Sequence, residues 1–316
     1  KCNVATPILV KTMRALAHHI VDLEIRPYDV ERDEGIMRAM VLRASRATGD
    51  VLVTLVVGQR IRELRTLSDA LTEEVASVVG VWVHNNSEVG NHIFARDEEG
   101  RVGVRPMSGR SWIEEVLNGV RYRIGPGDFF QTNPGTAEQM YKRTMDRLDL
   151  TKHDSYIDLY SGVGGLALQG ASRAGWTMGI EEIAGAVERA QEGARLNGLT
   201  VEFRAEHVLD ALPDLKRRVG DKGSILTVNP ARRGLEEGVI DGIIDLKPRR
   251  LAYVSCNPRS LARDLVRFRE AGWSIGEVEL FDMFPNTPHV ESLVMLESPG
   301  AMSVKPSRPP KRRVVR

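Results

Sequence analysis

From Pro126 onward, short apolar runs alternate with segments of helical periodicity, and this alternation constrains the fold more than any other feature of the chain. Strands that alternate with helices in sequence can pair in parallel, with the helices covering both faces of the sheet. The chain therefore predicts an α/β fold with a doubly wound sheet, whose ligands bind at the carboxyl ends of the strands. The strands are expected over 155–160, 177–181, 202–205, 224–228, 250–255, 274–280 and 292–296, and the helices over 137–148, 166–174, 184–197, 238–246 and 259–270.

The first part of the chain has a different pattern, in which helices and strands are not regularly interleaved. It predicts a smaller α+β domain with antiparallel strands over residues 1–125, followed by the α/β domain over 126–304. The last segment, 305–316, carries six basic residues and no acid. Two interpretations stay open for this segment, a solubilising tail without regular structure or an arm that contacts phosphates. In the first domain, strands are expected over 37–43, 51–57, 80–84 and 119–124, and helices over 11–22 and 64–79.

Composition excludes some classes of protein. With 42% apolar and 28% charged residues, the chain has the make-up of an ordinary globular protein. It has no apolar run of about eighteen residues, so we expect no membrane span. Its two cysteines, Cys2 and Cys256, cannot form a disulfide framework and suit a reducing cytoplasm. The formal charge of +1 gives no global electrostatic argument for nucleic acid, and no protein partner is implied.

A glycine-rich loop follows the strand predicted over 155–160. In the run 158–165, DLYSGVGG, the glycines let the backbone turn tightly and approach a ligand, and Gly162 is expected to line its pocket. The spacing is not the full Gly-x-Gly-x-x-Gly of dinucleotide folds, which favours S-adenosylmethionine over NAD. The next strand ends at Glu181, whose carboxylate can accept hydrogen bonds from ribose hydroxyls. The alternative for Glu181 is a surface acid that opens a helix.

A soft nucleophile and a carboxylate occur near the ends of two other predicted strands. Cys256 follows the apolar run 251–254, and Glu291 lies 35 positions later. A thiolate can add to an electrophilic carbon, and a carboxylate beside it can act as general base. Alone, each residue also has an ordinary interpretation, since a buried cysteine packs as a small hydrophobe and a strand-end acid forms ion pairs. Together with a methyl-donor pocket, the pair favours methylation of a pyrimidine at carbon 5.

Several motifs in order carry a resemblance to a known family. They are FFQTN at 129–133, the glycine loop at 158–165, NPARRG at 229–234, SCNP at 255–258 and the segment 282–291. With these motifs the chain resembles the RNA uridine-5-methyltransferases, which make 5-methyluridine in tRNA and rRNA. The resemblance implies a Rossmann-like methyltransferase domain, with Cys256 as nucleophile and Glu291 as the base that removes a proton. The donor-binding residues that it implies are Gln131, Tyr160, Glu181 and Asn229.

The implied chemistry explains these residue types. Addition of the Cys256 thiolate to carbon 6 of uracil lets carbon 5 take a methyl group, and Glu291 then removes the carbon 5 proton. Because the thiolate is the competent species, we expect the surroundings to lower the pKa of Cys256. The candidates for this effect are Arg259, Arg263 and the helix that begins after Pro258. The target uridine must leave its stack to reach such a pocket.

One departure from the family bears on the RNA substrate. Most members have Asp-Pro-Pro-Arg where this chain has Asn229-Pro230-Ala231-Arg232. Asparagine keeps a hydrogen-bonding carbonyl but loses the charge. A smaller 23S rRNA-specific branch resembles the chain here and in the FFQTNP and FDMFP segments, so 23S rRNA is favoured over tRNA. The domain over 1–125 is expected to contribute to RNA recognition.

Cys2 stands where many members of the family hold the fourth ligand of a 4Fe-4S cluster. The other three cysteines are absent from this sequence, and four thiolates are the usual requirement. Because these three ligands are absent, we expect either that an N-terminal segment is missing from the sequence, which begins at Lys1, or that this member has no cluster. An ordinary exposed cysteine is the third interpretation.

Two other functions compete with uridine methylation. The run 229–232 could be the Asn-Pro-Pro-aromatic motif of amino-nitrogen methyltransferases, but Arg232 replaces the aromatic residue that stacks the base. A non-catalytic RNA-binding or RNA-folding protein with a retained donor pocket is the other hypothesis. The presence of both Cys256 and Glu291 favours catalysis. The sequence does not indicate an oligomeric state.

Overall fold

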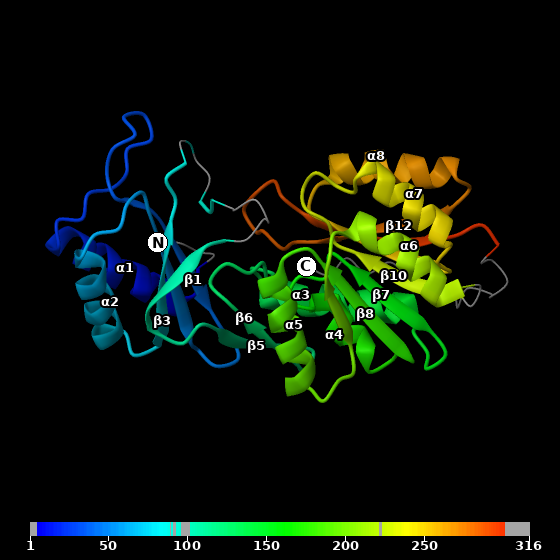
Figure 1. Ribbon diagram of the computed structural model, residues 1–316, viewed down its shortest axis with the longest axis horizontal. Helices are drawn as coiled ribbons and strands as arrows, with labels where there is room; N and C mark the ends of the chain where they lie inside the picture. The colour runs from blue at the N-terminus through cyan, green and yellow to red at the C-terminus, as the bar shows by residue number, and fades with distance from the viewer. Residues whose placement is uncertain (1–4, 89, 91–92, 96–101, 221–222, 301–316) are drawn as a thin grey trace.

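The structure, a computed structural model, describes residues 5–88, 90, 93–95, 102–220 and 223–300. Cys2 and the basic segment 305–316 lie outside these ranges. The described chain forms a four-stranded sheet in its first part and a seven-stranded sheet in its second, with a two-stranded hairpin between them (Figure 1). Within the described part, no helix is long and apolar enough to cross a membrane.

The first part is a mixed sheet with the order β1-β2-β3-β4. β2 and β3 pair in parallel through the crossover helix α2, whereas β1 and β4 pair antiparallel on either side. The parallel central pair differs from the expected antiparallel arrangement, because strand partners are set by tertiary packing that local pattern does not report. The elements are α1 (Pro7–Asp22), β1 (Met37–Ala44), β2 (Val51–Val57), α2 (Glu63–Glu74), β3 (Val78–Asn85) and β4 (Val104–Gly109).

Helix α2 is shorter than its predicted span of 64–79. It ends at Glu74, and Val75 takes a non-helical conformation. The β-branched residues that follow favour extended backbone, and Val78 already opens β3. β4 is a strand that the sequence did not predict, because its burial along VRPMSG gives no clean alternation.

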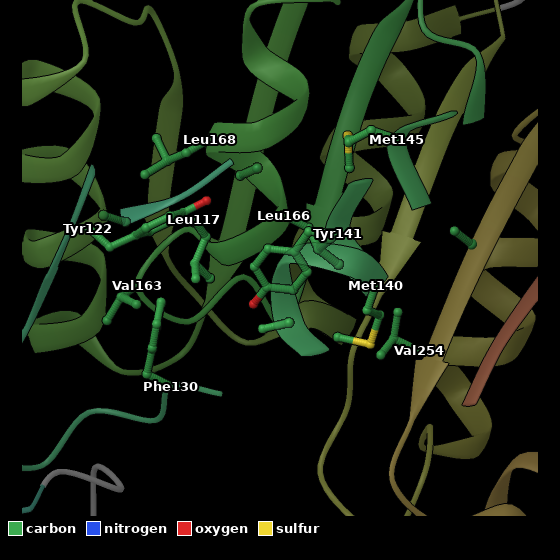
Figure 2. Packing of buried hydrophobic residues seen from close by; sticks show 14 of the residues in the cluster. Leu117, Tyr122, Phe130, Met140, Tyr141, Met145, Val163, Leu166, Leu168 and Val254 are labelled. Atoms are coloured by element: carbon green, nitrogen blue, oxygen red, sulfur yellow. The ribbon is translucent and has the colours of Figure 1, made fainter. Parts of the chain in front are cut away.

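The hairpin consists of β5 (Ile113–Leu117) and β6 (Val120–Ile124). β5 was also not predicted, although Asn-Gly between two alternating apolar runs is a strong hairpin signal. Leu117 and Tyr122 lie in the same apolar cluster as Tyr141 and Leu166 of the second part (Figure 2). Gln169 fastens the hairpin further by donating to the Leu117 carbonyl at 2.8 Å and to the Tyr122 hydroxyl at 2.7 Å. The hairpin thus packs on the second part, while the boundary near residue 125 stays a prediction.

The second part is a doubly wound sheet with the order β12-β13-β11-β10-β7-β8-β9, which confirms the predicted fold class. Helices α3, α4 and α5 cover one face together with the hairpin, and α6, α7 and α8 cover the other (Figure 1). The elements are α3 (Pro134–Leu148), β7 (Ser155–Leu159), α4 (Gly165–Ala171), β8 (Trp176–Glu181), α5 (Ala184–Leu196), β9 (Glu202–Ala205), α6 (Val208–Val219), β10 (Ser224–Val228), α7 (Glu237–Leu246), β11 (Arg250–Ser255), α8 (Pro258–Glu270), β12 (Ser274–Phe281) and β13 (Glu291–Glu297).

Two features of this sheet differ from expectation. β13 lies between β11 and β12 and runs antiparallel to both, so the sheet is not wholly parallel. Helix α6 was missed because Pro213, which lies inside it, is a helix breaker in isolation. Burial of Leu212, Leu215 and Val219 against the sheet offsets the lost backbone hydrogen bond.

Candidate active site

The predicted site residues follow the carboxyl ends of neighbouring strands. β7, β8, β10 and β11 are mutually parallel, so their carboxyl ends meet at one edge of the sheet. Tyr160, Glu181, Asn229 and Cys256 end or directly follow these four strands. β10 pairs with both β7 and β11, which places Asn229 between Tyr160 and Cys256 along this edge. Open α/β sheets bind their ligands at such an edge.

Asp158 supports the glycine loop through hydrogen bonds that its carboxylate accepts. Its carboxylate is buried and accepts hydrogen bonds from the Ala167 backbone N–H at 2.8 Å and from the Thr227 hydroxyl. Burial raises the pKa of Asp158 to about 7, and these two hydrogen bonds oppose that effect. Asp158 therefore ties the strand to the first turn of α4, and its role is structural support of the loop.

The loop itself has the backbone that a close ligand approach needs. Tyr160 has a φ of 61°, a left-handed conformation that is costly for a residue with a side chain. Gly162 follows at φ 54°, and a Cβ added to it would meet no atom within 4 Å, so open space lies above this residue. A ligand can therefore approach the backbone of Gly162 closely.

Glu181 reaches across to the glycine loop. Its Oε2 accepts from the Gly162 N–H at 3.0 Å, and its Oε1 accepts from the Ile183 N–H at 3.0 Å. Burial raises the pKa of Glu181, and the two backbone hydrogen bonds oppose that shift. The carboxylate joins the ends of β7 and β8 and keeps lone pairs that can accept hydroxyl groups of a sugar.

Gln131 is only 5% exposed, and its side chain acts on the Tyr141 hydroxyl. Burial raises the pKa of Tyr141, the charges of Asp158 and Glu291 raise it further, and Gln131 opposes these effects. The Tyr141 hydroxyl also lies beside the glycine loop, since a Cβ added to Gly165 would be 2.7 Å from it. Figure 2 shows Tyr141 with its ring packed in the apolar cluster near Leu166. Gln131 thus acts on a residue that is near both the loop and the Glu291 carboxyl group.

The antiparallel course of β13 explains why Cys256 and Glu291 meet. Ser255, the last residue of β11, is paired with Ser292 in β13. Cys256 comes directly after Ser255, and Glu291 comes directly before Ser292. Because the strands are antiparallel, Cys256 and Glu291 therefore oppose each other. Glu291 is only 3% exposed, whereas Cys256 is half-buried and has a free thiol. The nucleophile and base predicted from the sequence are therefore brought together by strand register.

Arg232 is the cation of this pair. The positive charge of its guanidinium acts on both the Cys256 thiol and the Glu291 carboxyl group. Its own carbonyl accepts hydrogen bonds from Asn257 Nδ2 at 2.8 Å and from Ser260 Oγ at 3.0 Å. These contacts hold the loop after β10 against the start of α8.

The prediction that Arg259 or Arg263 would serve the thiol is not supported by this geometry. The guanidinium of Arg263 is bound to the neighbouring Asp264 at 2.7 Å and to the Arg233 and Leu235 carbonyls. The cation comes instead from Arg232, which the sequence indicated only as part of the 229–234 motif. Its contact joins two loops that are distant in sequence, so local spacing could not reveal it.

Protonation at the pair differs from what the sequence predicted. Burial raises the pKa of Cys256, the charge of Glu291 raises it further, and Arg232 opposes both. The expected net lowering of this pKa is therefore wrong in direction. Burial likewise raises the pKa of Glu291 to about 7, again against the charge of Arg232. The charge of Glu291 favours the protonated thiol, and Arg232 favours ionisation of both groups.

Asp264 is a supporting residue that was not predicted from the sequence. It is fully buried in α8 and accepts from the Leu235 N–H at 2.8 Å and from the Tyr253 hydroxyl at 2.6 Å. Gly234 has a φ of 81°, and a Cβ added there would lie 2.5 Å from Asp264 Oδ2. Asp264 thus clamps the loop that carries Arg232. A buried acid on the apolar face of a predicted helix was the available signal.

Two further residues take ordinary roles or stay untested. His289 is exposed and packs edge-on against Phe284, with ring centroids 6.2 Å apart, so it is not a core histidine. Cys2 lies outside the described residues, and its role as a cluster ligand stays a prediction. In the part of the chain that the structure describes, no group of His, Cys, Asp and Glu side chains is arranged to hold a metal.

Known proteins with similar sequences are RNA methyltransferases. Residues 45–299 match the tRNA (uracil-5-)-methyltransferase family. The chain is 37% identical over 272 residues to an uncharacterized RNA methyltransferase of Gloeobacter violaceus, covering 85% of this chain and 57% of the relative. It is 33% identical over 301 residues to another of Caldanaerobacter subterraneus subsp. tengcongensis, covering 94% and 64%. The chain spans about three-fifths of the length of the curated relatives it matches.

A solved structure shares the architecture. The Pyrococcus abyssi tRNA (uracil-54, C5)-methyltransferase, in complex with S-adenosyl-L-homocysteine, is 28% identical and has a TM-score of 0.69. The similarity covers 92% of this chain and 66% of that one. It therefore extends over both the mixed sheet and the doubly wound sheet.

Proposed function

Since the chain belongs to the tRNA (uracil-5-)-methyltransferase family, we propose that it transfers a methyl group from S-adenosylmethionine to carbon 5 of a uridine in RNA. The observation that carries this proposal is the opposition of Cys256 and Glu291 at the carboxyl edge of the sheet. Both groups are needed for substitution at this carbon, and the positive charge of Arg232 acts on both of them.

The donor is assigned to the edge formed by β7, β8 and β10. The open space above Gly162 and the free lone pairs of Glu181 fit the ribose of an adenosine, and we assign Tyr160, Asn229 and Gln131 to the same ligand. S-adenosylmethionine supplies an electrophilic methyl group when it is bound. The Cys256–Glu291 pair lies on the neighbouring strands, so the uracil is assigned to the space beside the donor.

Cys256 begins the reaction and Glu291 completes it. The thiolate sulfur forms a bond to carbon 6 of uracil, and the electron pair of the C5–C6 double bond makes carbon 5 nucleophilic. Once carbon 5 carries the methyl group, it also holds one proton. Glu291 accepts that proton, the C5–C6 double bond forms again, and the bond from carbon 6 to sulfur breaks to return the thiolate. The proton leaves Glu291 for solvent and the product is 5-methyluridine.

Arg232 positions the charges of this sequence. Because burial disfavours ionisation of both Cys256 and Glu291, each needs a compensating cation when it is charged. The Arg232 carbonyl accepts hydrogen bonds from Asn257 and Ser260, which hold the backbone that carries this guanidinium. We assign to it the stabilisation of the thiolate before addition and again after elimination.

Within RNA, we propose 23S rRNA as the substrate in preference to tRNA. The support is the Asn229-Pro230-Ala231-Arg232 sequence and the segments around it, which resemble the 23S rRNA-specific branch. The related Pyrococcus abyssi enzyme is a tRNA methyltransferase. Mapping of 5-methyluridine by mass spectrometry in cells with and without the gene decides between them. Loss of one 23S rRNA site supports the proposal, and loss from tRNA instead overturns the choice of RNA but keeps the chemistry.

The chemistry is tested by trapping the covalent adduct. When 5-fluorouridine replaces the target uridine, carbon 5 holds fluorine where a proton should leave, so Glu291 cannot complete the reaction. We expect a stable protein–RNA adduct on a denaturing gel in the presence of S-adenosylmethionine, and its absence in Cys256→Ala. Cys256→Ala should still bind the RNA. If the wild-type chain binds RNA but forms no adduct and no 5-methyluridine, it is a non-catalytic RNA-binding protein.

A further inference from the structure

A groove lies in the first part of the molecule, separate from the residues of the candidate active site. It has a volume of about 570 Å³ and opens where β2 and β3 end and β4 begins. Its polar lining comes from Gln59, Arg60, Asn85 and Arg105, and the remaining lining residues are glycines and valines. No acidic side chain is among the described residues that line it.

The topology of this edge resembles that of the edge of the large sheet. β2 and β3 are parallel and joined by the crossover helix α2, so their carboxyl ends lie together. β4 runs antiparallel to β3, with Val104 opposite His84, and its first residues therefore close the groove on the third side. Clefts at the carboxyl ends of parallel strands are the usual ligand sites of such units.

The cations of the groove are free to bind an anion. Arg60 and Arg105 are exposed, and the guanidinium of neither forms an ion pair or hydrogen bond with any residue that the structure describes. Other arginines of this part are engaged, for example Arg110 with Asp50 at 2.7 Å. Arg38 adds a third charge nearby, since its Cδ would lie 4.0 Å from a Cβ on Gly58.

The segment around Gly103, which lines the groove, is fixed by His84 and packs against residues that precede Gln131. The buried ring of His84 is hydrogen-bonded through Nδ1 to the Gly103 carbonyl at 3.0 Å and accepts from the Ala95 N–H at 2.9 Å. The neighbouring Val102 packs on Gly127, because a Cβ added to Gly127 would lie 3.2 Å from the Val102 Cβ. Gly127 is four residues before Gln131. The groove is thus connected by packing to the segment that enters the candidate active site.

We propose that this groove binds phosphodiester groups of the RNA substrate, at nucleotides that flank the target uridine. Guanidinium groups bind phosphate oxygens in a bidentate manner, and the side-chain amides of Gln59 and Asn85 add neutral donors. Such contacts carry no base sequence and fix the position of the strand. The inference rests on the proposed function, because it assigns a second contact surface to the same RNA.

The test compares RNA binding by the full chain and by R60A/R105A at several salt concentrations. The probes are in vitro transcribed 23S rRNA and tRNA, and binding of each is measured whether or not it is methylated. We expect Kd and KM for RNA to rise roughly tenfold with kcat unchanged, and the slope of log K against log salt to fall by about one to two. R60K/R105K should keep most of the salt slope, because it preserves the charges. Arg269→Ala, at the far end of α8, is the matched control and should bind like wild type.

Two results would overturn the inference. One is wild-type affinity and an unchanged salt slope in R60A/R105A while the wild-type chain methylates the RNA. The other is loss of stabilisation by a mononucleotide in R60A/R105A with RNA binding unaffected, which would assign the groove to a small anion. Failure of the wild-type chain to form the 5-fluorouridine adduct concerns the proposed function instead, since RNA binding and its salt slope are measured without catalysis.

Discussion

The two sides of the candidate active site satisfy their buried acids in different ways. On the donor side, Asp158 and Glu181 accept hydrogen bonds from backbone N–H groups and from Thr227, so each is paired without a ligand. On the catalytic side, Glu291 has no hydrogen bond from any residue that the structure describes, and the Arg232 charge is the compensating influence. The acids of the donor side are satisfied by hydrogen bonds within the protein. The Glu291 carboxyl group keeps its acceptor sites, and we assign these to the substrate.

The two sides should therefore respond differently to mutation. Removal of an acid that is hydrogen-bonded to the loop should disturb ligand binding through that loop. Removal of an acid without such bonds should change the chemistry with little effect on folding.

Glu291→Gln should have the largest effect. Loss of the base should lower turnover about a thousandfold, because general-base contributions are typically 10²–10⁴-fold. Addition of Cys256 does not require the base, so the methylated adduct should accumulate on ordinary uridine RNA. The measurements are initial rates and a denaturing gel. Glu297→Gln, on the same strand but at its other end, is the control and should leave turnover near wild type. Normal turnover in Glu291→Gln would break the assignment of the base.

Arg232→Ala should lower the rate of adduct formation by about ten- to a hundredfold, because the positive charge that favours the Cys256 thiolate is lost. Arg232→Lys should recover part of the rate by keeping the charge. Arg233→Ala changes the adjacent exposed arginine, which pairs with Glu236, and should have little effect. An unchanged rate in Arg232→Ala would place the thiolate-stabilising group elsewhere.

Turnover should fall as pH is lowered through about 7. The pKa of Glu291 is raised to about 7. Below this pH the carboxyl group is protonated and cannot accept the carbon 5 proton, so the rate should drop roughly tenfold per pH unit. The charge of Glu291 also raises the pKa of Cys256, so Glu291→Gln should shift the alkylation of Cys256 by iodoacetamide to lower pH. A shift in the opposite direction would contradict the coupling.

Glu181→Gln should have the smallest effect of the four. The amide keeps one acceptor for the loop but loses the charge, so KM for S-adenosylmethionine should rise roughly tenfold with kcat almost unchanged. Steady-state kinetics and calorimetric binding measure this. Glu182→Gln, the next residue in the chain, serves as the control. Equal effects of both changes would remove the special role of Glu181.

Local pattern was sufficient for much of the fold and for the position of the chemistry. The strands 202–205, 224–228 and 250–255 occur at their predicted bounds because their apolar runs are bounded by turns. Cys256 and Glu291 could be singled out because their residue types match one reaction. What failed depends on distant contacts, such as α6 with its internal Pro213, the parallel β2–β3 pair, and Arg232 as the partner of the thiol. Cooperative packing and long-range pairing leave no local signature.

Strand β13 has a consequence for biosynthesis. Among the described strands it is the last in chain order, yet it inserts between two earlier ones and brings Glu291 with it. A ribosome therefore releases the nucleophile before the base, and an incomplete nascent chain has Cys256 without Glu291. On the proposed mechanism such a chain could capture RNA but could not release it. On the same mechanism, only a chain that has added β13 to the sheet holds both residues and could release the methylated RNA.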